Sequence, residues 1–337
     1  MKGNLDVNSI PVTILSGFLG SGKTTFLNQM IKSNREKNIF VIMNEFGEIN
    51  IDSELLVEIE DTQIYQLNNG CMCCVANNEM KSTFAKIMTL KDQGEVNIDH
   101  IVIELSGLAN PEPVIRTITE TPFLCDCFYI DSVYALVDSQ NGMNQLGKFE
   151  EMAPQILYAD KILLTKEAQN QLKQLMDKIH QINPFIPVEA IEFEGDVASR
   201  YLDKNLFGQK PVAFNDYLNK WISNYSDNSP NNDHHHHHSD LTSFAFELEA
   251  SFKADQVEKW LEALIKEYGA DLVRYKGLMA VEEFDHQLIV QGVHQWFQLN
   301  RGNAWKTNEP RVTRMVFIGH NLEPIRIKQL LLSPDSN

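Results

Sequence analysis

The chain has 337 residues, and its 46 acidic and 29 basic residues give a formal net charge of −17 at pH 7. Hydrophobic residues make up 43% and charged residues 22%, which is typical of a globular protein with room for two domains and a sizeable core. An acidic surface repels nucleic-acid backbones and anionic lipid headgroups, so we expect neither nucleic acid nor a membrane as a partner. The same charge suits metal cations or a basic protein, or it serves solubility alone.

Cysteine usage and hydropathy indicate the compartment. Five cysteines are too few for the disulfide framework of a secreted domain, and their clustering does not resemble paired spacing. The segment before the first strand lacks a signal-peptide core, and no apolar run approaches the roughly 18 residues that span a bilayer. We therefore expect a cytoplasmic protein whose thiols stay reduced.

Buried strands alternate with helical segments in the first part of the chain. Apolar β-favouring runs predict strands within residues 10–17, 38–47, 100–107, 132–139 and 161–167. Helical spacing predicts a helix within residues 22–34, whose inward residues are Phe26, Leu27, Met30 and Ile31. Strands that are apolar throughout and alternate with helices indicate an α/β fold, with a mainly parallel sheet covered by helices on both faces.

A polar stretch divides the chain into two domains. Residues 224–240 hold no large apolar residue after Tyr225 and are typical of an exposed linker. We therefore predict a first domain at 1–223, a linker at 224–240 and a small α+β domain at 241–337. The second domain is expected to hold strands at 241–252, 271–282, 286–300 and 311–320, and helices at 255–270 and 322–333. The inward face of its first helix comprises Val257, Trp260, Leu261 and Leu264.

A phosphate-binding loop follows the first strand. The segment "GFLGSGKT", residues 17–24, fits the pattern G-x-x-x-x-G-K-[ST] between a buried strand and a helix start. The glycines let backbone N–H groups turn toward phosphates, Lys23 reaches the β and γ phosphates, and the Thr24 hydroxyl binds Mg²⁺. The nucleotide-binding residues that this motif predicts are Gly17, Gly20, Ser21, Gly22, Lys23, Thr24 and Thr25.

A second nucleotide element ends another strand. In "IVIELSG" the carboxylate of Glu104 stands at the carboxyl end of the strand, where it can hold Mg²⁺ through water. Gly107 follows, with its amide placed to meet a γ-phosphate. The alternative is that Glu104 is a strand-end acid that caps the next turn.

The base-recognition segment departs from the usual pattern. GTP-binding proteins commonly carry N-K-x-D after this strand, whereas this chain has "TKEA" from Thr165 to Ala168. Lys166 can pack its stem along the base, but Ala168 offers no acceptor for guanine. Losing such a paired polar contact costs about 1–3 kcal/mol, so we expect weaker guanine selectivity unless Glu167 or a loop residue substitutes.

These motifs together resemble the CobW-type P-loop GTPases, metallochaperones related to the nickel-insertion GTPases of urease and hydrogenase maturation. The resemblance covers nearly the whole chain and includes "GFLGSGKTTFLN", "NEFGEINID", "GCMCC", "ELSGLANP", "ADKILLTK", the His-rich linker, "GVHQWF" and "RMVFIGH". It implies a P-loop GTPase domain with a CobW-like C-terminal domain, slow intrinsic GTP hydrolysis, GTP or GDP with Mg²⁺, and a client metalloprotein. It also implies delivery of a transition metal, most often Zn²⁺, with Co²⁺ or Ni²⁺ as alternatives.

Three cysteines form the expected metal site. Cys71, Cys73 and Cys74 carry soft thiolates that prefer zinc, copper(I) or cobalt to magnesium, and their spacing lets the sulfurs converge on one ion. The alternative is that they are buried cysteines acting as small apolar residues, although their asparagine flanks argue against deep burial. In the family pattern a carboxylate from "NEFGE" completes the site, which makes Glu45 and Glu48 candidate ligands.

The same carboxylates are candidates for a switch. The segment "NEFGEINID" follows the second strand and could order over the γ-phosphate only when that group is present. GTP would then change metal affinity through Glu45 and Glu48. The catalytic candidates are therefore Glu45, Glu48 and Glu104.

Three further features carry weaker hypotheses. Cys125 and Cys127 lie two apart near an expected strand start, where they are core residues or a second thiol pair on one face. The five histidines 234–238 can collect Zn²⁺, Ni²⁺, Co²⁺ or Cu²⁺ weakly, or are an engineered insertion. His294 and Trp296, on an expected strand, belong to a client-docking face or to ordinary sheet packing.

The sequence thus predicts a GTP-dependent metallochaperone. One alternative is a zinc buffer or sensor in which nucleotide is regulatory. Another is a small-molecule P-loop kinase, which would leave the three cysteines without a purpose.

Overall fold

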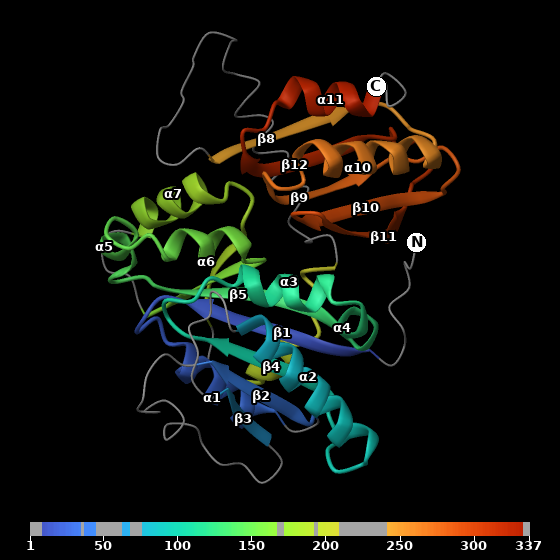
Figure 1. Ribbon diagram of the computed structural model, residues 1–337. Coiled ribbons are helices and arrows are strands. Elements are labelled where there is room, and N and C mark those ends of the chain that lie inside the picture. The colour runs from blue at the N-terminus through green and yellow to red at the C-terminus, as the bar shows by residue number, and fades with distance from the viewer. Residues whose placement is uncertain are drawn as a thin grey trace. The chain divides into compact units, whose positions relative to one another are not determined.

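A computed structural model describes residues 9–34, 37–44, 63–67, 76–166, 172–191, 195–208 and 241–332. The described chain forms two compact units, one ending at Phe207 and the other beginning at Gly208 (Figure 1). The expected linker at 224–240 lies outside the described residues, so its boundaries stay a prediction. Within the described residues no helix is both long and apolar enough to cross a bilayer.

The first unit is built on a seven-stranded sheet in the order β3-β2-β4-β1-β5-β6-β7, and all its described pairings are parallel. The two edge strands, β3 and β7, were not anticipated from sequence; they have only five and three residues, and neither length leaves much periodicity to read. The strands are β1 (Ile10–Gly17), β2 (Ile39–Asn44), β3 (Gln63–Leu67), β4 (His100–Leu105), β5 (Phe128–Asp138), β6 (Lys161–Thr165) and β7 (Val188–Ala190).

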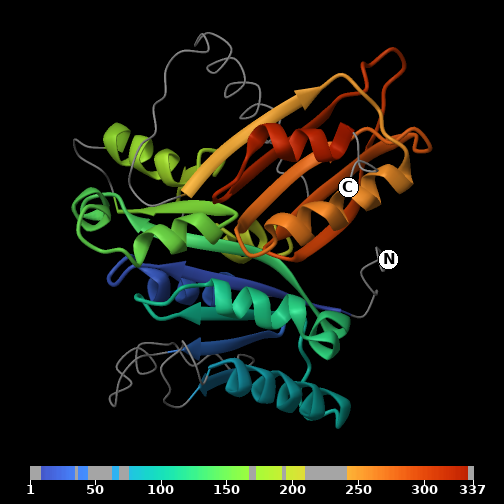
Figure 2. The same cartoon turned by 45° about the horizontal axis from the view of Figure 1, so that its top comes forward.

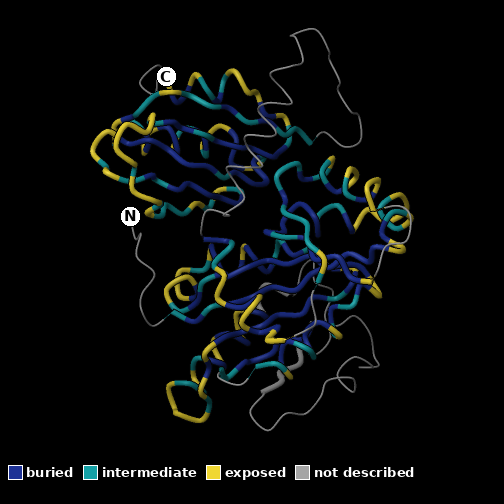
Figure 3. The backbone as a smooth tube through the Cα atoms, turned by 180° about the vertical axis from the view of Figure 1, so that it is seen from behind, coloured by how far each residue is buried: buried dark blue, intermediate teal, exposed yellow. Residues whose placement is uncertain are grey.

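Helices cover both faces of this sheet, as central strands that are buried along nearly their whole length require. The helices are α1 (Lys23–Ser33), α2 (Ala76–Asp92), α3 (Glu112–Glu120), α4 (Pro122–Cys127), α5 (Gly142–Leu146), α6 (Met152–Tyr158), α7 (Leu172–Ile182) and α8 (Val197–Tyr201). One apolar core joins α1 and α8 to the sheet, and a second joins α6 and α7 to it. Figure 2 shows α3 and α6 on the same side of the sheet, and Figure 3 shows the central strands as the buried layer. The predicted α/β architecture is confirmed.

The described part of the second unit is a five-stranded antiparallel sheet in the order β11-β10-β9-β12-β8 with two helices. Its helices pack over a core that includes Trp260 and Phe317, both fully buried. All four predicted inward residues of α10 are buried. The elements are β8 (Leu241–Leu248), α10 (Ala254–Tyr268), β9 (Leu272–Met279), β10 (His286–Val293), β11 (Trp296–Ala304), β12 (Thr313–His320) and α11 (Pro324–Leu332).

Two predictions about local structure are wrong. Residues 286–300 are not one strand: β10 pairs Val293 with Trp296 of β11 across a two-residue turn, in which His294 has a φ of 51°. His294 and Trp296 therefore do not share a strand face. Cys125 and Cys127 lie in α4, where a spacing of two turns side chains by roughly 200°, so they do not share a face either.

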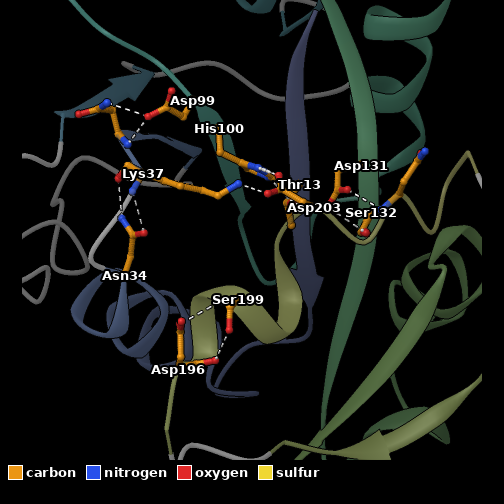
Figure 4. Close-up of polar contacts among 12 residues, drawn as sticks. Thr13, Asn34, Lys37, Asp99, His100, Asp131, Ser132, Asp196, Ser199 and Asp203 are labelled. Carbon is orange, nitrogen blue, oxygen red and sulfur yellow. Dashed lines mark hydrogen bonds and ion pairs between the residues drawn. The ribbon is translucent and has the colours of Figure 1, made fainter. Parts of the chain in front are cut away.

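A buried polar network lies near the amino-terminal ends of the central strands (Figure 4). Thr13 Oγ1 is 2.8 Å from His100 Nε2 and 3.2 Å from Asp131 Oδ2. On the other side of the ring, His100 Nδ1 is 3.1 Å from Asp203, which also accepts a hydrogen bond from Lys37. Burial, and secondarily the charge of Lys37, lowers the pKa of His100 to about 3. The network therefore ties β1, β4 and β5 together around a neutral imidazole.

Candidate nucleotide site

The loop between β1 and α1 has backbone angles that demand glycine. Gly17 has a φ of 135°, and a Cβ there would lie 2.3 Å from the carbonyl oxygen of Leu136. Gly20 and Gly22 have φ values of 72° and 94°, in the left-handed region that side chains disfavour. The glycines of the motif are thus required by the turn itself, and the turn leads directly into the N-terminus of α1, which favours negative charge.

Two polar side chains of the loop are buried against it. Lys23 Nζ donates to the carbonyl oxygens of Gly17, at 2.8 Å, and Phe18, at 3.3 Å. Ser21 is 1% exposed, and its hydroxyl has no hydrogen-bond partner among the described residues. A buried hydroxyl beside a lysine ammonium suits a phosphate oxygen, which accepts such hydrogen bonds.

The proposed magnesium ligands lie together at the carboxyl ends of β1 and β4. The register pairs Leu15 with Glu104, and the next helix starts six residues after β1 ends. This geometry brings Thr24 Oγ1 within 2.7 Å of Glu104 Oε1. A hydroxyl and a carboxylate are hard oxygen ligands of the kind that Mg²⁺ prefers, so these residues fit the ion.

The loop after β4 lies directly against the phosphate loop. It forms a turn in which Ala109 N donates to Ser106 O at 2.9 Å. A Cβ on Gly107 would lie 2.6 Å from the backbone nitrogen of Leu19, so only glycine allows this approach. Gly107 is thereby placed beside the loop that carries Lys23.

The expected base-binding segment is held by two residues at the end of β5. Lys166 has a φ of 58°, and its Nζ donates to Asp138 Oδ2 at 2.6 Å and to Gly20 O at 3.2 Å. Ser139 Oγ donates to the carbonyl oxygen of Thr165 at 2.8 Å and also to that of Lys166. The Thr165 hydroxyl in turn donates to Ser21 O at 2.7 Å, which joins this segment to the phosphate loop.

Asp138 is ionised in this arrangement. Burial opposes its charge, but hydrogen bonds from Lys166, Asn141 and the Gln140 amide outweigh burial and lower the pKa of Asp138. The Lys166 stem is therefore held at the edge of the site by a fixed negative charge. The sequence predicted only a strand at residues 132–139; an acid at the carboxyl end of that strand is the signal that points to Asp138.

Residues 11–189 match the family described as CobW/HypB/UreG, nucleotide-binding domain. The chain belongs to this family. Residues 241–333 match the family described as the cobalamin synthesis protein CobW C-terminal domain. The two matches cover both described units of this CobW-family protein.

Named relatives extend over nearly the whole chain. The "Zinc chaperone YjiA" of Escherichia coli (strain K12) is 32% identical over 331 residues, which cover 96% of this chain and 98% of the relative. The "Zinc-regulated GTPase metalloprotein activator 1" of Saccharomyces cerevisiae is 25% identical over 366 residues, covering 96% and 82%. The crystal structure of Zn(II)-bound YjiA GTPase from E. coli matches with a TM-score of 0.66 and 26% identity, covering 98% of this chain and 100% of that one.

Several predicted site residues of this CobW-family chain lie outside the described residues. They are Glu45, Glu48, Cys71, Cys73, Cys74, Glu167, Ala168 and the histidines 234–238. Their roles stay predictions. Among the residues that are described, no group of three or more His, Cys, Asp or Glu side chains could hold a metal ion. Thr25, which is described, is exposed in the first turn of α1.

Proposed function

We propose that this protein is a GTP-dependent metallochaperone that carries zinc to a client metalloprotein. The observation that carries the proposal is the oxygen pair of Thr24 and Glu104 at the mouth of a complete phosphate loop, in a chain that also holds the C-x-C-C motif. Full-length similarity to a protein named as a zinc chaperone supports the choice of cargo. The proposal includes a cytoplasmic location, where thiols stay reduced, and no nucleic-acid partner, which the net charge of −17 supports.

The nucleotide half of the mechanism uses residues of the first unit. Backbone N–H groups of the loop at 17–24 and the ammonium of Lys23 bind the β and γ phosphates. Thr24 and Glu104 would hold Mg²⁺, which neutralises charge on the phosphate oxygens when bound. Hydrolysis transfers the γ-phosphoryl group to water, breaks its bond to the β-phosphate oxygen, and leaves GDP and inorganic phosphate. We assign Glu45 and Glu48 to the segment that senses this change.

The cargo half of the mechanism uses the thiolates of Cys71, Cys73 and Cys74. Three thiolates with one exchangeable carboxylate, from Glu45 or Glu48, can load and release zinc, whereas a closed four-thiolate site would be structural. Because those carboxylates also follow the strand next to β4, their position responds to the γ-phosphate. Nucleotide state then sets zinc affinity.

The decisive experiment is a zinc titration against a chromophoric competitor, with a non-hydrolysable GTP analogue, with GDP and without nucleotide. We expect one tight zinc per chain whose affinity differs by about 5–150-fold between nucleotide states. Phosphate release from GTP, measured with and without zinc, completes the assay. Equal zinc affinity in all three states would instead indicate a buffer, and a phosphorylated metabolite would indicate a kinase.

A further inference from the structure

Helix α6 carries a polar side chain on its buried face. Gln155 is 2% exposed and lies on the helix between Met152 and Ile156, which belong to the apolar core over the sheet. Burying an amide without hydrogen bonds is strongly unfavourable, so its hydrogen-bond partners determine whether it can occupy this position. Leucine or methionine would suit this position if packing were its only purpose.

Both partners of the Gln155 amide lie in the loop after β4. Its Nε2 donates to the carbonyl oxygen of Gly107 at 3.0 Å and to that of Ala109 at 3.2 Å. An amide nitrogen has two protons, so these two bonds use its whole donor capacity. Gln155 thereby bridges a helix that packs on the sheet and the turn that contacts the phosphate loop.

The direction of the Gly107 N–H follows from the same turn. The carbonyl of Ser106 points into the turn, toward Ala109 N, and a trans peptide aims the following N–H the opposite way. The Gly107 N–H therefore points out of the turn, and it has no hydrogen-bond partner among the described residues. Contact with Leu19 limits the loop on one side, and Gln155 limits it on the other.

We infer that Gln155 is a positioning residue that holds the Gly107 amide where a γ-phosphate meets it. The inference rests on the proposed function, because it assumes that the loop beside Lys23 binds a nucleoside triphosphate. GDP lacks the γ-phosphate, so Gln155 contributes to the affinity for GTP and not to that for GDP. It thus determines part of the preference for the triphosphate.

A second buried amide, on the residue that directly follows α7, bonds to α6 and supplies a matched control. Asn183 is 4% exposed, and its Nδ2 donates to the carbonyl oxygens of Ile156 and Leu157, both at 3.3 Å. It therefore anchors the same helix through two carbonyls without bonding to the loop after β4. Removing either amide destabilises α6, but only Gln155 bears on Gly107.

The test compares Gln155→Met with Asn183→Leu, each in the full-length protein. Affinities for GDP and for a non-hydrolysable GTP analogue are measured by calorimetry in Mg²⁺, and the midpoint of thermal unfolding is recorded. We expect both variants to unfold at a lower temperature. Gln155→Met should lower the ratio of analogue affinity to GDP affinity by about tenfold, the effect of one misplaced hydrogen bond, whereas Asn183→Leu should leave the ratio unchanged.

Should Gln155→Met fail to fold, Gln155→Asn keeps an amide donor but shortens the side chain by one methylene, which draws the amide away from the two carbonyls, and the same loss of ratio is expected. A folded Gln155 variant with the wild-type ratio would overturn the inference alone. An equal fall of the ratio in Asn183→Leu would also overturn it, because the effect would then belong to the helix. A wild-type protein that binds neither nucleotide would overturn the proposed function as well.

Discussion

The oxygen pair of Thr24 and Glu104 is the most local feature of the proposed chemistry. These atoms lie 2.7 Å apart because Thr24 is in the first turn of α1, Glu104 is the last residue but one of β4, and both elements meet at the carboxyl edge of the sheet. A neutral amide in place of the carboxylate keeps the shape but removes the charge that attracts a cation. The substitution Glu104→Gln therefore separates the effect of the charge from that of the side chain's packing.

We expect Glu104→Gln to weaken the Mg²⁺-dependent part of GTP binding by about 2 kcal/mol, roughly thirtyfold, because a charged contact is lost. GTP affinity is measured with Mg²⁺ and with a chelator, and only the first value should fall. The control is Glu112→Gln, at the start of α3, which should leave the GTP affinity unchanged both with Mg²⁺ and with the chelator. An unchanged Mg²⁺ dependence in Glu104→Gln would remove Glu104 from the ion site.

The selectivity for guanine is a second property that depends on a single residue, Ala168. Ala168 offers no acceptor to guanine, so Ala168→Asp should raise the preference for GTP over ATP by about 1–3 kcal/mol. Competition binding of the two nucleotides measures this preference, with ATP affinity as the internal reference. If the ratio does not change, another residue already recognises the base.

At the scale of elements, the His100 network joins three central strands of the first unit. The imidazole is fully buried between Thr13 of β1 and Asp203, whose carboxylate is paired with Lys37. Its pKa of about 3 lies below the ordinary value of 6.5, so the folded protein resists protonation there. Unfolding frees the ring to bind a proton at any pH below about 6.5.

The sign of the pH dependence follows directly. Below a pH of about 6.5, the pKa of His100 in the unfolded chain, the unfolded state binds more protons than the folded state. The titration of His100 therefore leaves the free energy of unfolding unaffected above that pH and lowers it as the pH falls further. We expect the free energy of unfolding to fall by about 1.4 kcal/mol per pH unit on account of His100 between pH 6 and 5.

Urea denaturation at several pH values measures this slope, and His100→Gln supplies the comparison because glutamine does not titrate. In the variant, the free energy of unfolding should depend less steeply on pH between pH 6 and 5, by the amount that the binding of one proton accounts for. Identical slopes in the two proteins would mean that His100 does not resist protonation in the folded state.

At the scale of the whole molecule, the proposal links two chemistries in one chain. If Cys71, Cys73 and Cys74 share one ion with Glu45 or Glu48, zinc must change GTP affinity by the same factor by which GTP changes zinc affinity. This reciprocity is a thermodynamic requirement and does not depend on how the coupling is transmitted. It therefore tests the proposal without reference to any single contact.

We expect the double variant Cys73→Ser, Cys74→Ser to lose the tight zinc site and the coupling while keeping basal nucleotide affinity. Deleting the histidines 234–238 should lower only the number of weakly bound ions, because a run of adjacent neutral imidazoles binds metal weakly and exchanges it quickly. Both are measured by zinc titration in parallel with GTP titration. The proposal fails if the double variant still binds one zinc tightly, or if saturating zinc leaves the GTP affinity of the wild type unchanged.

The sequence alone determined the features that depend on neighbours in the chain. The phosphate loop was predictable because its glycines, Lys23 and Thr24 are contiguous, and the inward faces of α1 and α10 because helical spacing repeats within a few residues. Predictions from local patterns were wrong where one stretch of sequence was compatible with a strand and also with a turn or a helix. The two-residue turn after Val293 and the helix at Cys125 and Cys127 interrupt stretches that otherwise resemble strands.

Only the tertiary structure decided which distant residues support the site. Gln155 lies 48 residues from Gly107 along the chain, and Asp138 lies 28 from Lys166, yet each pair is joined by a hydrogen bond. The sequence predicted no helix at α6, so neither the burial of Gln155 nor the direction of its amide toward the loop after β4 was expected. Parallel strands place the ends of remote segments at one edge of the sheet, and hydrogen bonds between such ends have no signature in local sequence.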